Sequence, residues 1–182
     1  GDAARPAAPA GFGRSPAENR DGGTDTTAWG IQIAAACGET SDSRNVAGFS
    51  SFGSEGVDAL DRSDPPLSPG PSLSLYFLNE DTRAERRTVD IRPEIPSRGD
   101  AGDRGQRWVF DVANTMGDDG PLEMKLEFSG LDRVPADLEI RLVDRSLERT
   151  IDLRAQRTYV YARSRRGFVS DAASARFELL VG

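Results

Sequence analysis

The residue types in this chain that could do chemistry gather first in one acidic loop. Asp58, Asp61 and Asp64 recur at intervals of three, and Pro65 and Pro66 follow them. Carboxylate oxygens together with the carbonyl oxygens of a tight loop are the ligands that calcium prefers. The spacing differs from that of an EF-hand, and Asp-Pro-Pro is also ordinary turn chemistry. Two alternatives therefore stay open here, a calcium site and a loop capped by its own aspartate side chains.

Other catalytic chemistry finds little support in the composition. The chain has no histidine, which excludes a Ser-His-Asp triad and argues against a zinc site. Its 30 acidic residues make chance carboxylate pairs inevitable, and no pair stands out for glycoside hydrolysis. Cys37, the single cysteine, lacks a histidine partner and ends an apolar run, so we expect a small buried side chain. We therefore expect no enzymatic activity, and no cofactor other than this calcium ion.

Two tryptophans could act as stacking platforms for a sugar. Trp29 and Trp108 each lie in phase with the apolar residues of their own segments, which favours burial in the core. Carbohydrate binding therefore requires that one of the two is exposed.

Charge and residue type also indicate the kind of partner. A net charge of −7 argues against a nucleic-acid binder and against binding to anionic lipid surfaces. Of the 23 basic residues only Lys125 is lysine, which fits a GC-rich genome and also favours ion pairing at interfaces. The candidates for contact with a protein partner are Phe12, Arg14, Arg163, Arg165 and Arg166. For the last three, the alternative is a solvated hairpin loop.

The elements that must position these residues are strands. We expect residues 1–28, which are rich in Ala, Pro and Gly, to form an extended arm, because such a segment buries too little surface to offset its ordering entropy. From residue 29 to 182 apolar residues alternate with polar ones, and no stretch sustains a helical period. The alternating sets are centred on residues 31–33, 73–77, 89–91, 108–112, 122–128, 138–142, 151–153, 159–161 and 177–181. About nine strands with one wet face predict an antiparallel β-sandwich, immunoglobulin-like or jelly-roll. The long loop 38–71 should hold a further short strand at Val46–Phe49.

The order of several short motifs resembles a known kind of module. The motifs are Asn45-Val46-Ala47-Gly48, Asp64-Pro65-Pro66, Leu75-Tyr76-Phe77, Trp108-Val109-Phe110-Asp111-Val112, Tyr159-Val160-Tyr161 and the terminal Arg176-Phe177-Glu178-Leu179-Leu180-Val181-Gly182. Together they resemble a β-sandwich module found near the C-terminal end of large secreted bacterial proteins, over about residues 29–182. The resemblance implies an exported, extracytoplasmic and non-catalytic domain. The chain departs from that pattern because it lacks a following sorting tail and begins with the arm.

Two functions follow as expectations. The first is an accessory subunit that binds a larger protein assembly through its arm and its sandwich surface, for example at the periplasmic face of a respiratory or photosynthetic membrane complex. The alternative is a module that binds carbohydrate or cell-wall polymer in a secreted protein. The sequence has no apolar segment long enough to span a bilayer, so any membrane association would be peripheral. It begins at Gly1 rather than at Met, so we expect that leading sequence was removed, as a signal peptide, as another segment or by design.

Overall fold

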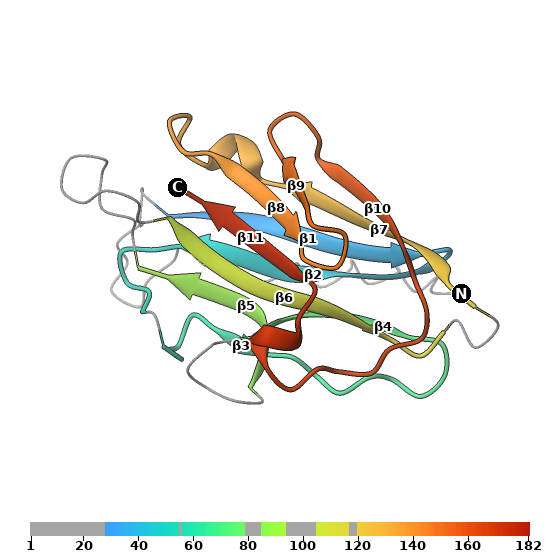
Figure 1. Cartoon of the computed structure of the whole chain (residues 1–182). Helices are drawn as coiled ribbons and strands as arrows, with labels where there is room; N and C mark the ends of the chain where they lie inside the picture. The colour runs from blue at the N-terminus through green and yellow to red at the C-terminus, as the bar shows by residue number, and fades with distance from the viewer. Residues whose placement is uncertain (1–27, 55, 79–84, 94–104, 117–119) are drawn as a thin grey trace, which may run out of the picture.

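The chain is an all-β protein. The computed structural model describes residues 28–54, 56–78, 85–93, 105–116 and 120–182, and the arm up to residue 27 lies outside them (Figure 1). The strands are β1 (Trp29–Cys37), β2 (Thr40–Phe49), β3 (Arg62–Ser63), β4 (Leu73–Leu78), β5 (Arg86–Arg92), β6 (Gln106–Asn114), β7 (Leu122–Ser129), β8 (Ile140–Asp144), β9 (Arg149–Asp152), β10 (Thr158–Arg163) and β11 (Phe177–Val181). Two short 3₁₀ turns, η1 (Leu131–Arg133) and η2 (Ala172–Ser174), are the only helical segments in the described ranges, and neither could cross a membrane.

All described strands belong to one strongly curled sheet. Its order is β10-β7-β1-β2-β5-β4-β6-β11-β8-β9, with β3 paired to β5. Every pairing is antiparallel except that of β2 with β5, which is parallel. The sheet is therefore mixed, and the expectation of purely antiparallel pairing was wrong at this place. A parallel neighbour needs a long crossover connection, which the polar passage after β2 supplies.

The curl brings the two ends of the sheet order together around one core. The ring of Phe177 on β11 lies 6.3 Å from that of Tyr159 and 5.0 Å from that of Tyr161, both on β10. These strands are distant in the sheet order but face each other across the interior. Inward residues such as Ile31, Leu126, Trp108 and Phe177 fill this core and are completely or almost completely buried. The described strands thus form one continuous sheet rather than two separate ones.

The strand prediction holds for the alternating segments and misses the polar ones. β7 shows the expected alternation, with Met124, Leu126 and Phe128 buried between exposed charged neighbours. β2 is much longer than the short strand expected at Val46–Phe49, because its first half, Thr40–Arg44, is polar and pairs with β1 through a tight hairpin. A search for alternating apolar residues misses this half of the strand, because all its side chains are polar.

A second, smaller cluster covers the outer face of β4 and β6. Tyr76, Leu78 and Val109 point away from the main core and pack against Ala172, Ala175 and the partly buried Leu67, Phe168 and Val169. The Val169 backbone N–H donates to the Tyr76 hydroxyl at 2.8 Å. The segment before β11 therefore turns β4 into a strand that is buried on both faces.

Candidate functional site

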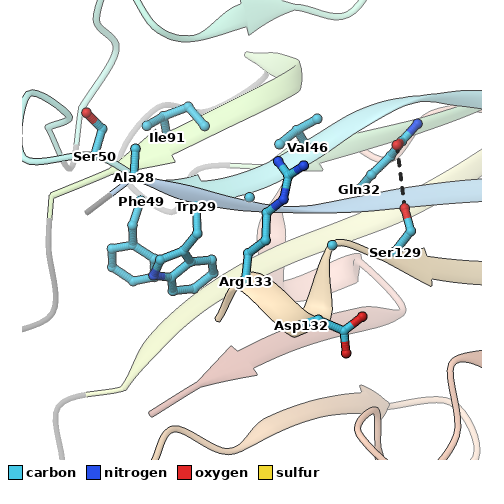
Figure 2. A pocket seen from close by; sticks show the side chains of 12 residues that line it. Ala28, Trp29, Gln32, Val46, Phe49, Ser50, Ile91, Ser129, Asp132 and Arg133 are labelled. Atoms are coloured by element: carbon cyan, nitrogen blue, oxygen red, sulfur yellow. Dashed lines mark hydrogen bonds between the residues drawn. The ribbon is translucent and has the colours of Figure 1, made fainter. Parts of the chain in front are cut away.

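A hollow opens on the described surface where β1 begins. It has a volume of about 470 Å³, and we name it the β1 groove (Figure 2). Its lining comes from β1, β2, β5 and the turn from β7 into η1, and comprises Ala28, Trp29, Gly30, Gln32, Val46, Phe49, Ser50, Ile91, Ser129, Gly130, Asp132 and Arg133. A smaller hollow lined by Gln32, Ala34, Glu127, Phe128, Ser129, Arg157 and Thr158 adjoins it, since Gln32 and Ser129 line both.

Aromatic side chains form the apolar part of the β1 groove. The rings of Trp29 and Phe49 lie 4.4 Å apart at an angle of 46°, side by side in Figure 2. Phe49 meets Trp108 edge-on at 5.3 Å, and the Trp108 indole N–H donates to the Asp90 carbonyl oxygen at 3.2 Å. Trp108 is completely buried, as expected, whereas Trp29 is only partly buried. The groove thus opens at the edge of the main core.

Glycines let the backbones come close enough to shape this groove. A Cβ on Gly130, whose φ is +82°, would lie 2.4 Å from the Gly30 carbonyl oxygen. A Cβ on Gly30 would lie 2.9 Å from Val46 Cγ1. Larger side chains at these two positions would both fill the groove and push its walls apart.

The polar lining is held by hydrogen bonds across three strands. Gln32 Nε2 on β1 donates to the Ser43 carbonyl oxygen on β2 at 2.6 Å, and the Ser129 hydroxyl at the end of β7 donates to Gln32 Oε1 at 3.5 Å. These contacts fix the side chain that separates the groove from the adjoining hollow.

The ionisable lining residues of the β1 groove are Asp132 and Arg133, and only one of them is paired. Arg157 donates two hydrogen bonds to Asp132, of 2.7 and 3.1 Å, and they hold the pKa of Asp132 below its ordinary value. Arg133 is exposed, and its guanidinium has no hydrogen-bond or ion-pair partner among the described residues. In Figure 2 it extends from η1 toward Val46. A single paired carboxylate does not supply the two carboxyl groups that glycoside hydrolysis uses.

The acidic loop places its three carboxylates on separate donors. Asp58 accepts from the backbone N–H groups of Ser54 and Leu60, both at 2.7 Å. Asp61 accepts from the Ile91 N–H at 3.0 Å and from Arg87 Nη1 at 3.2 Å, and burial raises its pKa above the ordinary value. Asp64 accepts from the Ser74 hydroxyl at 3.0 Å, and its pKa is likewise raised by burial.

Asp58 caps its own loop, whereas Asp61 and Asp64 tie the loop to β5 and β4. The described residues contain no group of three or more acidic or cysteine side chains placed to hold a metal ion. The calcium site at Asp58, Asp61 and Asp64 stays a prediction that this arrangement does not favour.

The basic residues named from the sequence do not form one exposed patch. Arg163 is buried at the end of β10 and forms an ion pair with Asp111 on β6. Arg166 is exposed, donates to the Ser174 carbonyl oxygen at 3.1 Å and lies 3.7 Å from Asp111. Arg165 is exposed and engaged in an interaction of its own. Phe12 and Arg14 lie outside the described residues, so their role in binding stays a prediction.

Sequence reasoning did not find the β1 groove. It treated Trp29 as a core residue and gave Gly30, Gly130 and Arg133 no role. The available signal was two glycines at strand termini, Gly30 just after the start of β1 and Gly130 just after the end of β7. Comparison of the chain with protein-family models, curated proteins and solved structures finds no match.

Proposed function

We propose that this protein is a non-catalytic interaction domain, an accessory subunit that binds a larger protein assembly through the surface around the β1 groove. The observation that carries the proposal is the groove itself, which joins a partly buried aromatic pair to one unpaired cation. Such a mixture of apolar area and sparse, oriented polar groups is typical of binding sites.

The fold and the compartment belong to the same proposal. The two ends of the curled sheet face each other across the core, as the two sheets of an immunoglobulin-like or jelly-roll sandwich do. Here they would be the two layers of one continuous hydrogen-bonded sheet. The resemblance to modules of secreted bacterial proteins supports a location outside the cytoplasm, and the periplasmic face of a membrane complex is one assembly that would suit it. Ala28, the last residue of the arm, lines the groove.

A crosslinking experiment tests this proposal in the cells that make the protein. A photo-crosslinking amino acid replaces Gln32 in the groove, and a matched variant carries it at the exposed Arg149 on β9, at the other end of the sheet order. We expect one defined adduct from the groove position and none from Arg149. Native mass spectrometry should show the same complex with unmodified protein. A free monomer in both measurements would overturn the proposal.

Carbohydrate binding is the second candidate, and the partial exposure of Trp29 is the observation that favours it. Sugar platforms present a flat, open aromatic face, whereas the Trp29 ring packs against Phe49 and the core. This geometry is the reason for preferring a protein partner. A glycan array, probed with and without calcium, separates the two.

A further inference from the structure

We propose that the β1 groove and the turn beside it bind a peptide segment of the partner that carries a large apolar side chain next to an acidic one. This inference rests on the proposed function and names the chemistry of its partner. It is carried by three features that meet at this place, an apolar wall, a rigid turn that exposes Phe52, and the charge of Arg133.

The turn that follows β2 holds a large apolar side chain in solvent. Phe52 is 57% exposed although it lies only two residues beyond Ser50, which lines the groove. Single exposed apolar side chains are common on protein surfaces, but this one follows Phe49, which lines the groove, by only three residues in the chain. Aromatic side chains are enriched among the residues that anchor protein interfaces.

The backbone keeps this turn rigid. The Gly53 N–H donates to the Ser50 carbonyl oxygen at 3.0 Å, the Phe52 N–H donates to the Ser50 hydroxyl at 3.2 Å, and the Ser50 N–H donates to the Arg92 carbonyl oxygen at 3.1 Å. A Cβ on Gly53 would lie 2.7 Å from the carbonyl carbon and oxygen of Arg92, so the turn is pressed against β5. Phe52 is thus presented in a fixed place, which lowers the ordering cost of binding.

The charge of the two adjoining hollows selects an acidic ligand. Asp132 is neutralised by Arg157, and Glu127 in the smaller hollow pairs with Lys125. Among the described residues that line these hollows, Arg133 is then the charge without a partner. The whole chain carries −7, but at about 0.1 M salt the Debye length is about 10 Å, so distant charges are screened and Arg133 dominates locally.

The two tryptophans of the chain make the binding directly observable. The probe is a short acetylated peptide with Leu-Phe-Asp-Glu at its centre, and its matched partner carries Leu-Phe-Lys-Lys. Two indole N–H signals are expected in the NMR spectrum of ¹⁵N-labelled protein. We expect the acidic peptide to shift the Trp29 signal and to leave that of the buried Trp108 in place, and the Lys peptide to shift neither.

Three variants then assign the contacts. Arg133→Glu should weaken binding of the acidic peptide about tenfold or more, the loss of one charge-assisted hydrogen bond. Phe52→Ala should weaken it by a similar factor without lowering the midpoint of thermal unfolding, because Phe52 packs little in the folded domain. Arg149→Ala, an exposed position away from the groove, should leave the affinity unchanged.

Several outcomes would overturn the inference. The first is equal binding of the Lys peptide. The second is a Trp29 signal that shifts with a cello- or chito-oligosaccharide but not with peptide. The third is a Trp29 signal that shifts only as the protein concentration rises, which would indicate that a second copy of the chain occupies the groove. If no peptide reaches Trp29 while crosslinking from Gln32 still yields a defined adduct, the proposed function stands and only this ligand class falls. If the adduct is also absent, both fall.

Discussion

The Tyr159 hydroxyl on β10 donates a 2.8 Å hydrogen bond to the Asp144 carboxylate on β8, two strands that lie near opposite ends of the sheet order. Arg176, which precedes β11, completes the junction. It donates to both Asp144 oxygens, at 3.0 and 2.7 Å, and to the Ala162 carbonyl oxygen on β10 at 3.3 Å. These side-chain hydrogen bonds therefore connect β10 to β8, two strands that are not paired with each other through their backbones.

Removing the hydroxyl of Tyr159 should loosen this junction. Tyr159→Phe deletes a buried hydrogen bond to a charged group, so we expect the free energy of unfolding in urea to fall by about 1.5–3 kcal/mol. Tyr161→Phe is the matched control, because Tyr161 lies on the same face of β10 and its buried hydroxyl makes no hydrogen bond of normal geometry among the described residues. Equal losses in the two variants would contradict the role of the junction.

The tyrosines should resist ionisation together. The chain has three, and burial is the largest cause that raises the pKa of Tyr76, Tyr159 and Tyr161 from 10.0 to about 12 each. The folded state thus keeps protons that the unfolded chain releases, so its stability is fully present below pH 10 and declines as the pH rises toward 12.

Near-ultraviolet absorbance of tyrosinate checks this expectation. Native protein should show little tyrosinate at pH 10, where the protein unfolded in urea is half ionised. On further alkalinisation, ionisation and loss of the β-sheet circular dichroism signal should coincide. A gradual titration centred on pH 10 in folded protein would contradict the burial of all three rings.

The turn beside the groove offers a matched pair of glycines. Gly53→Ala places a methyl group 2.7 Å from the Arg92 backbone, which cannot move aside cheaply, and we expect a loss of about 1–3 kcal/mol. Gly56→Ala has nothing within 4 Å of its new Cβ and should be neutral or slightly stabilising, by up to about 1 kcal/mol. Chemical denaturation measures both, and a Gly53 variant as stable as wild type would show that the turn is not pressed against β5.

Arginine geometry, rather than charge alone, should matter at Arg154. Its guanidinium donates through Nη2 to the Pro135 carbonyl oxygen at 2.6 Å, through Nε to that of Leu138 at 3.2 Å and through Nη1 to that of Leu131 at 3.5 Å, and so holds the segment around η1. Lysine cannot reproduce this fork. Arg154→Lys should lower the free energy of unfolding by about 1 kcal/mol and speed amide exchange around η1. Arg149→Lys, exposed on β9, is the control that should change neither quantity.

Much of the fold could be predicted from the sequence, because alternating apolar and polar residues mark a strand that has one buried face. β7 and β11 show this pattern, and both were predicted. β4 and β6 are buried on both faces because the segment around Phe168 covers them, a contact that no local pattern encodes. The parallel pairing of β2 with β5 is equally long-range, and the polar half of β2 gave no apolar signal.

The candidate site was less predictable for a related reason. The β1 groove draws on segments from four places in the chain, and its shape depends on residues without side chains, such as Gly30 and Gly130. Arg163 was assigned to an exposed basic cluster from its neighbours in sequence. Its partner Asp111 lies on β6, so only the folded chain shows that this cation points inward.

The position of β1 between β2 and β7 has a consequence for biosynthesis. During synthesis, β1 can pair with β2 as soon as β2 has been made. Its other edge pairs with β7, and Gln32 contacts Ser129, 97 positions later in the chain. Loop closure over such separations makes folding slow, on the order of milliseconds to seconds for β-rich domains of high contact order. A nascent chain that has emerged only through β6 therefore exposes an unmatched strand, and a ribosome-bound intermediate of that length should be where chaperones engage and where misassembly begins.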